Sequence, residues 1–140
     1  MTMVDTSAWV DFLAGRDAPH VQLLKQHVVT QRIAVGDLIM CEVLQGLRSE
    51  REFQRVRWWL ATLEVVPMCD AAMAVQAARN YRLLRNQGIT IRRTLDCLIA
   101  TCCLTRGYVL LHNDRDFDPF EEHLGLRVIH PLASSTLPLD

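Results

Sequence analysis

Five acidic residues, in four short motifs spread along the chain, are the side chains most suited to chemistry. They are Asp5, Glu42, Asp96, Asp114 and Asp116. Each stands where a helix or strand is expected to begin or end, or on a helix whose other residues are mainly apolar. Acidic side chains are rarely buried without a partner that compensates their charge. The pattern therefore predicts a metal site.

The chemistry of such a site follows from its charge. Ionised carboxylates about 5 Å apart repel each other by about 3 kcal/mol per pair at an effective dielectric constant near 20, which a divalent cation would remove. Oxygen ligands suit Mg²⁺, with Mn²⁺ as the alternative, and the chain lacks the clustered Cys and His that zinc prefers. Such a cation lowers the pKa of a bound water and stabilises charge on a phosphate during in-line displacement.

The first acid stands between a strand and a helix. Residues 2–4 form a short apolar run that predicts a strand, and Asp5 follows it directly. We expect Thr6 or Ser7 to cap the next helix, which Gly15 ends. This order of strand, acid and helix places the carboxylate at the carboxyl end of a strand.

The later acids are expected at similar positions. Residues 109–111 predict a strand that ends in the polar turn of residues 112–116, which contains Asp114 and Asp116. We expect Thr94 to cap a helix over residues 95–105 that is apolar nearly all round, as in a helix packed against a sheet. Asp96 falls in the first turn of that helix, where the helix dipole favours a negative charge.

The remaining elements are predicted from hydrophobic periodicity. Further helices are expected over residues 19–29, 37–48, 50–63, 71–87 and 117–124, and further strands over residues 33–35, 63–66 and 128–130. Short apolar strands that alternate with amphipathic helices indicate an α/β fold with a central, mainly parallel β-sheet flanked by helices. Ligands of such sheets bind beyond the carboxyl ends of the strands.

Length and composition limit the other possibilities. The chain has 140 residues, half of them hydrophobic, which predicts a single domain over residues 1–140 with a core of about 2–131 and a frayed tail over 134–140. No apolar run reaches the roughly 18 residues of a membrane span, so we expect a cytoplasmic protein. The five cysteines lack metal-site spacing and are expected to be buried, reduced thiols.

Each acid also has a purely structural explanation. Asp5 could cap a helix, Glu42 could pair with an arginine, and Asp96 could complement a helix dipole. Asp114 and Asp116 could simply form a turn, where aspartate is common. These explanations together require four coincidences, whereas one metal site accounts for all five residues.

The motifs resemble those of PIN domains and, among them, of the VapC-type ribonuclease toxins of bacterial toxin–antitoxin pairs. The four matching blocks occupy residues 4–11, 42–48, 96–100 and 113–117 and occur in the family's usual order. Each block alone is weakly specific, since an acid after a strand is common. All four in order, over residues from about 2 to 131, make the resemblance specific.

The resemblance implies a PIN-like fold and a Mg²⁺-dependent endoribonuclease that acts on structured RNA, most often tRNA or ribosomal RNA. It also implies a cognate VapB-type antitoxin that holds the enzyme inactive, and a homodimer. By motif position, Asp5 and Asp96 would bind the metal directly. The other three acids, Glu42, Asp114 and Asp116, would bind it through water or complete a second site. Thr6 or Ser7 would orient the attacking water or a carboxylate.

Arginines are the candidates for contacts with RNA phosphates. The net charge is −1, so phosphate affinity must come from local groups, and Arg92, Arg93 and Arg115 stand next to the acids. Salt bridges from these arginines to the same acids are an equal alternative. Trp58 and Trp59 are adjacent on an expected helix, so one is expected to face the core and the other is a candidate for contact with a partner.

Other functions compete with this interpretation. Receiver domains and aspartate-nucleophile phosphatases also gather acids at strand ends, but they require a late lysine, and Lys25 is the only lysine here. Ser7 also replaces the second acid that the phosphatases use. A catalytically silent PIN-like module that binds RNA or serves as a scaffold remains an alternative. DNA is an alternative substrate, because metal-assisted hydrolysis does not need the 2′-hydroxyl.

Overall fold

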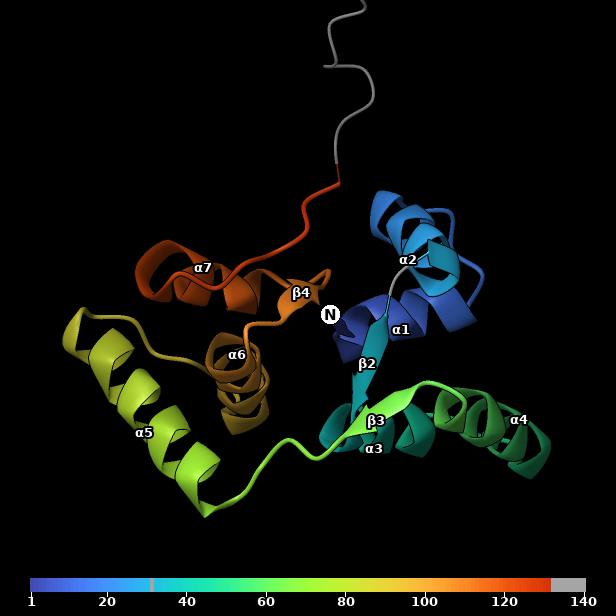
Figure 1. Ribbon diagram of the computed structural model, residues 1–140, viewed down its shortest axis with the longest axis horizontal. Coiled ribbons are helices and arrows are strands. Elements are labelled where there is room, and N and C mark those ends of the chain that lie inside the picture. Colours follow the sequence, from blue (N-terminus) through green and yellow to red (C-terminus); the bar gives the residue numbers. More distant parts are fainter. Residues whose placement is uncertain (31, 132–140) are drawn as a thin grey trace, which may run out of the picture.

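The structure, a computed structural model, describes residues 1–30 and 32–131. Its strands are β1 (Thr2–Val4), β2 (Ile33–Gly36), β3 (Glu64–Val66) and β4 (Val109–Leu111). Its helices are α1 (Thr6–Leu13), α2 (Pro19–Thr30), α3 (Asp37–Gln45), α4 (Glu50–Ala61), α5 (Ala71–Asn86), α6 (Thr94–Arg106), the 3₁₀ helix η1 (Arg115–Phe117) and α7 (Asp118–Leu124). In Figure 1, α5 and α6 lie on one side of the sheet and α1 and α2 on the other. This is the expected α/β architecture.

The four strands form one parallel sheet in the order β3-β2-β1-β4. Met3 of β1 pairs with Ala34 of β2 on one side and with Leu110 of β4 on the other. The last residues of β1 and β4, Val4 and Leu111, are therefore direct neighbours. This register brings the acidic motifs that follow these two strands to the same edge of the sheet.

The prediction of a strand over residues 128–130 is wrong. Val128 forms only an isolated bridge with Leu110, supported by a hydrogen bond from the Ile129 amide to the Leu110 carbonyl. Pro131 follows at once and has no amide hydrogen to extend a ladder. The expected frayed tail, residues 134–140, lies outside the described residues.

The core lies between the sheet and its covering helices. The strands β1 and β2 are buried along their whole length, and helix α6 is buried on most sides, as its composition predicted. Trp9 is fully buried and packs edge-on against Trp59, with ring centroids 5.5 Å apart. Trp58 is 72% exposed, which confirms the expectation that only one of the adjacent tryptophans faces the core.

Two predicted helix starts are shifted by one residue. Asp5, rather than Thr6 or Ser7, is the N-cap of α1 and accepts the Ser7 amide hydrogen at 3.0 Å. Arg93, rather than Thr94, occupies the N-cap position of α6 and makes no capping hydrogen bond. Both shifts place a charged side chain of a functional motif at the first residue outside a helix, where its backbone is extended.

The cysteines only partly match the expectation. Cys97, Cys102 and Cys103 are buried free thiols, but Cys41 and Cys69 are free and exposed, so burial was wrongly expected for these two. Cys41 lies on a helix face turned to solvent and Cys69 on the loop before α5. Over residues 1–30 and 32–131, none of the helices combines the length and the hydropathy needed to cross a membrane.

Candidate functional site

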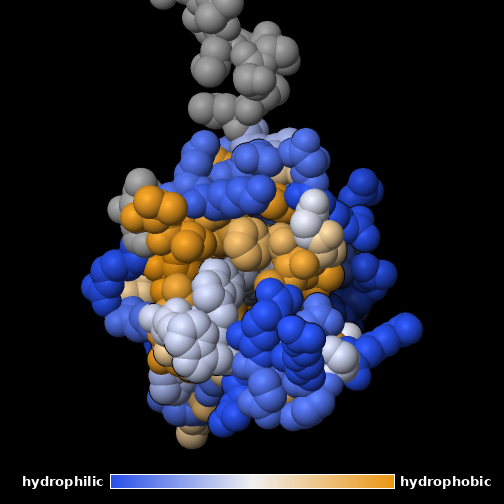
Figure 2. Space-filling view, turned by 90° about the vertical axis from the view of Figure 1, so that its right-hand side faces the viewer, coloured by the Kyte–Doolittle hydropathy of each residue, from blue (hydrophilic) through white to orange (hydrophobic). Residues whose placement is uncertain are grey.

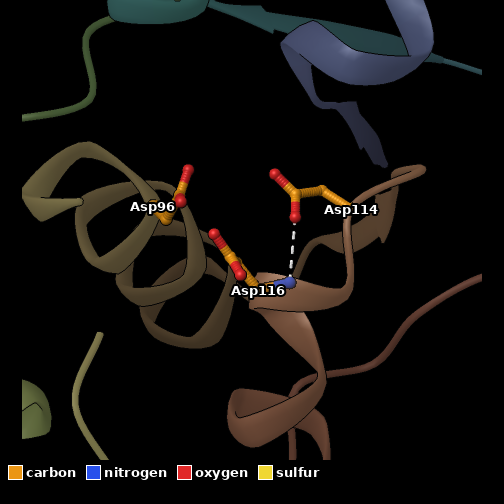
Figure 3. A group of neighbouring side chains, drawn as sticks. All are labelled: Asp96, Asp114 and Asp116. Carbon is orange, nitrogen blue, oxygen red and sulfur yellow. Dashed lines mark hydrogen bonds between the residues drawn. The ribbon is translucent and has the colours of Figure 1, made fainter. Parts of the chain in front are cut away.

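Three of the predicted acids meet at one point. Asp96, Asp114 and Asp116 each offer a carboxylate oxygen, and these oxygens all lie within 4.8 Å of one another. Figure 3 shows Asp96 projecting from α6 and the other two from the segment that follows β4. The carboxylate of Asp114 accepts the amide hydrogen of Asp116 at 2.9 Å, which fixes the turn between them. We call these three residues the carboxylate cluster.

Asp5 is a buried carboxylate with one unsatisfied oxygen. Its Oδ2 accepts the amide of Ser7 at 3.0 Å and the hydroxyl of Ser7 at 2.6 Å. Its Oδ1 is buried and has no hydrogen-bond partner among the described residues. Burial raises the pKa of Asp5 to about 6, the hydrogen bonds from Ser7 oppose this rise, and the charge of Asp96 adds to it. Buried carboxylate oxygens normally accept a hydrogen bond. Because Oδ1 accepts none from the described residues, it is available as a ligand for a cation.

Glu42 reaches the site from α3 and is held by Thr6. The hydroxyl of Thr6 donates to Glu42 Oε1 at 2.6 Å. The other oxygen of Glu42 lies 3.5 Å from Arg93 Nη1. Ser7 has a matching role on the other side, since its hydroxyl bonds to Asp5 and accepts the amide of Asn113 at 2.9 Å. The first turn of α1 thus orients two of the acids and ties them to the loop after β4.

The arginines suggested for RNA contact lie close to the acids. Arg93 donates two hydrogen bonds to Asp96, at 2.8 and 3.1 Å, and Arg92 donates to Asp116 at 2.9 Å. Arg115 is exposed and lines a hollow of about 450 Å³ beside Asp114. Arg92 and Arg93 therefore form the salt bridges that were the alternative to RNA contact.

Several positioning residues were missed at the level of sequence. Asp11 accepts hydrogen bonds from His20 at 2.6 Å and from the side chain of Asn113 at 3.2 Å. His112 accepts the amide of Asp114 at 3.0 Å through Nδ1. Both contacts support the turn that carries Asp114. The only available signal was that Asp11 and Asn113 stand inside the acidic motifs.

The residues present fit a divalent cation. The carboxylate cluster offers three oxygen ligands, and Oδ1 of Asp5, which is not part of that cluster, is a further unpaired carboxylate oxygen. Oxygen ligands suit hard cations such as Mg²⁺ and Mn²⁺. Burial raises the pKa of Asp96, although the guanidinium of Arg93 opposes this rise. Several carboxylates that lie close together repel one another, and the single positive charge of Arg93 compensates them less than a divalent cation would.

Comparison with known proteins identifies the family. The sequence model for the PIN domain matches residues 2–122, which include all five acids. The chain belongs to the PIN domain family. This PIN domain is 32% identical over 121 residues to ribonuclease VapC11 of Mycobacterium tuberculosis, in an alignment that covers 84% of this chain and 90% of that protein. The family expected from the four acidic motifs is therefore confirmed.

Solved structures share the fold of this PIN domain. VapBC2 from Rickettsia felis, solved bound to a promoter DNA fragment, aligns with a TM-score of 0.71 and 19% identity, over 91% of this chain and 96% of that chain. VapC20 from Mycobacterium tuberculosis, described as a sarcin-ricin loop cleaving toxin, aligns with a TM-score of 0.63 and 17% identity, over 84% and 93%. At these identities the similarity establishes the PIN-like α/β fold.

Proposed function

We propose that this PIN domain is a VapC-type toxin, a divalent-cation-dependent endoribonuclease that cleaves structured RNA. Its substrate would be tRNA, with ribosomal RNA as the alternative. The observation that carries the proposal is the convergence of the carboxylate cluster beside Asp5, a buried acid with one unpaired oxygen. The relative VapC11, which is named a ribonuclease, supports the same activity.

The acids would hold the cation, and two hydroxyl groups orient them. Asp96, Asp114, Asp116 and Asp5 would hold Mg²⁺, or Mn²⁺ in its place, and Glu42 would act through water or complete a second site. The cation, when bound, supplies a lowered pKa for a coordinated water and compensates phosphate charge. Thr6 fixes Glu42, and Ser7 fixes Asp5 with its free oxygen turned away from the hydroxyl.

The proposed reaction is hydrolysis by direct attack of water. A water loses a proton to a site carboxylate and attacks the phosphorus in line with the 3′ oxygen. The bond between phosphorus and the 3′ oxygen breaks, and the leaving oxygen takes up a proton from water. The products carry a 5′-phosphate and a 3′-hydroxyl, so a 2′,3′-cyclic phosphate at the cleaved end would contradict this mechanism.

The first test uses purified, antitoxin-free protein with total tRNA and, separately, ribosomal RNA, in the presence of Mg²⁺ or Mn²⁺. Asp96→Asn keeps the size of the side chain and removes its charge, and EDTA removes the cation. Glu64→Gln, a matched neutralisation of an exposed acid on β3, serves as the control. We expect discrete cleavage by the wild type and by Glu64→Gln, and none with Asp96→Asn or EDTA.

Other outcomes of that test favour other functions. Binding of the cation and of RNA without cleavage would favour the silent RNA-binding or scaffold module. Cleavage of DNA but not of RNA would favour a metal-dependent DNA nuclease. Cleavage that survives EDTA would contradict the role proposed for the carboxylates.

An exposed apolar face supports the proposed antitoxin partner. Figure 2 shows apolar side chains gathered between polar regions on the side of the molecule formed by α1, α2 and α4. The structure has a hollow of about 340 Å³ on α1 and α4. Its lining consists of Phe12, Leu13, Arg55, Val56, Trp58 and Trp59. We propose that the cognate VapB-type antitoxin covers this face, because exposed apolar patches of this kind mark interaction surfaces.

Co-purification with the cognate antitoxin tests the partner. Trp58→Ala should weaken retention of a tagged antitoxin, whereas Leu83→Ala, which removes an exposed apolar side chain from α5, should not. Equal retention of both variants would place the antitoxin elsewhere. The homodimer and the cytoplasmic location are part of the same proposal, and light scattering of the free protein measures the first.

A further inference from the structure

The side chain of Arg93 lies among the acids of the site. Its Nη2 and Nε donate to the two carboxylate oxygens of Asp96, at 2.8 and 3.1 Å. Its Nη1 lies 3.5 Å from Glu42 and its Nη2 lies 3.8 Å from Asp114. One guanidinium therefore contacts carboxylates from α3, from α6 and from the loop after β4.

Asp96 depends on this guanidinium for its charge. Its side chain is 0% exposed, so water cannot solvate the carboxylate. A buried charge that loses its only partner is strongly destabilising. An arginine guanidinium stays charged in proteins, so it can leave Asp96 only by moving.

Arg93 has the freedom to move, whereas Asp96 does not. The arginine side chain is 50% exposed and starts from the N-cap of α6, where the backbone is extended with φ −123° and ψ 128°. Rotation about its side-chain bonds would bring the guanidinium into solvent without breaking a helical hydrogen bond. Asp96 stands inside the first turn of α6 and is fixed by the helix.

We propose that Arg93 is the resident counter-cation of the site and that a divalent cation binds Asp96 only by displacing it. Both oxygens of Asp96 accept hydrogen bonds from Arg93, and the same guanidinium lies 3.5 Å from Glu42 and 3.8 Å from Asp114, so it occupies the space between carboxylates that a cation would take. Two positive groups close to one carboxylate also repel each other. This inference rests on the cation site of the proposed function, and it makes Arg93 a positioning residue that sets cation affinity.

Calorimetric titration of the full chain with Mn²⁺ tests the competition. Arg93→Gln removes the charge and keeps a side chain of similar length with a hydrogen-bond donor. Arg32→Gln is the matched control, because Arg32 pairs with Glu64 at 2.7 Å on the distant strand β3. We expect Arg93→Gln to bind Mn²⁺ about tenfold more tightly than the wild type or more, which corresponds to about 1.4 kcal/mol, and Arg32→Gln to match the wild type.

The outcomes separate this inference from the cation site itself. Equal or weaker binding by Arg93→Gln would overturn the displacement and leave the cation site standing. Failure of the wild type and both variants to bind Mn²⁺ would overturn both. NMR of the wild type avoids any folding defect of a variant: the Nε–H resonance of Arg93 should shift towards a solvent-exposed position as Mg²⁺ is added. An unchanged resonance at saturating Mg²⁺ would overturn the displacement.

Discussion

The hydroxyl of Thr6 donates a 2.6 Å hydrogen bond to Glu42, although the two residues are 36 positions apart in the sequence. This bond joins the first turn of α1 to the middle of α3 and holds the Glu42 carboxylate towards Arg93. Thr6→Val keeps the shape of the side chain and removes the hydroxyl. We expect a loss of about 10- to 100-fold in RNA cleavage, as for other groups that orient a metal-site carboxylate.

Thr6→Ser is the matched control for that measurement, because it keeps the hydroxyl and removes only a methyl group. We expect cleavage rates within about threefold of the wild type for Thr6→Ser, since the hydrogen bond survives at a cost smaller than the loss of the donor. Equal rates for Thr6→Val and Thr6→Ser would mean that the bond has no part in orienting Glu42.

Asp11 predicts a pH dependence of stability. Burial alone would raise the pKa of Asp11, but hydrogen bonds from His20 and Asn113 and the charges of His20 and Arg16 lower it below its ordinary value of 3.8. A lowered folded-state pKa stabilises the protein above the unfolded pKa, and this contribution is lost as the pH falls through the folded-state pKa. Asp11→Asn should therefore cost about 1 kcal/mol at pH 7 and progressively less below about pH 4.

Urea unfolding of the two proteins at several pH values measures this difference. Asp17→Asn, which neutralises an exposed acid just after α1, is the control and should change the free energy of unfolding little at any pH. A cost of Asp11→Asn that stays constant down to pH 3 would show that the ionised form of Asp11 is not what stabilises the fold.

The thiols should divide into two reactivity classes. Cys41 and Cys69 are exposed, whereas Cys97, Cys102 and Cys103 are buried, and burial raises the pKa of each buried thiol. Because the thiolate is the reactive form, two thiols should react rapidly with Ellman's reagent at pH 8 in the native protein. All five should react in guanidinium chloride, and rapid native labelling of a third thiol would contradict the packing of α6.

Gly36 is predicted to be intolerant of a side chain. It ends β2 and caps α3, the helix that carries Glu42, and a Cβ atom there would collide with the buried Met68 side chain. Gly36→Ala should cost about 1–3 kcal/mol in the free energy of unfolding, as overpacked core positions do. Gly46→Ala is the control, because a Cβ at Gly46 meets only ordinary contacts of 3.6 Å or more.

A double variant identifies the cause of that loss. Gly36→Ala combined with Met68→Ala should be less destabilised than the sum of the two single changes, because the collision no longer exists in the double variant. Additive losses would instead point to the backbone of Gly36. Thermal unfolding of the four proteins under one condition supplies the comparison.

The elements and the acids of the site were predictable because their signals are local. An apolar run followed by an acid, as at Asp5, predicts both a strand and a residue at its carboxyl end. Parallel strands then place such residues at the same edge of the sheet, where Asn113, the residue before Asp114, donates its amide to Ser7 in the first turn of α1. Helix α6 was predictable because its apolar residues surround the helix on nearly every side.

Long-range partners could not be predicted from the sequence in the same way. Asp5, Thr6 and Ser7 are all good N-cap residues, and only the backbone path decides that Asp5 is the cap. The contacts of Arg93 depend on three elements meeting in space. The strand expected over residues 128–130 was wrong because β-propensity does not reveal whether a neighbouring strand continues far enough to pair with it.

The position of β1 between β2 and β4 has a consequence for synthesis of the protein on the ribosome. The first strand to emerge stays without one neighbour until Val109–Leu111 has been translated. Asp5 and Glu42 are therefore made well before Asp114 and Asp116, which follow β4. Because β1 pairs with β4, the fold has contacts between residues that are far apart in the sequence, which gives it a high contact order. A site built in this order stays incomplete until β4 and the segment after it have left the ribosome.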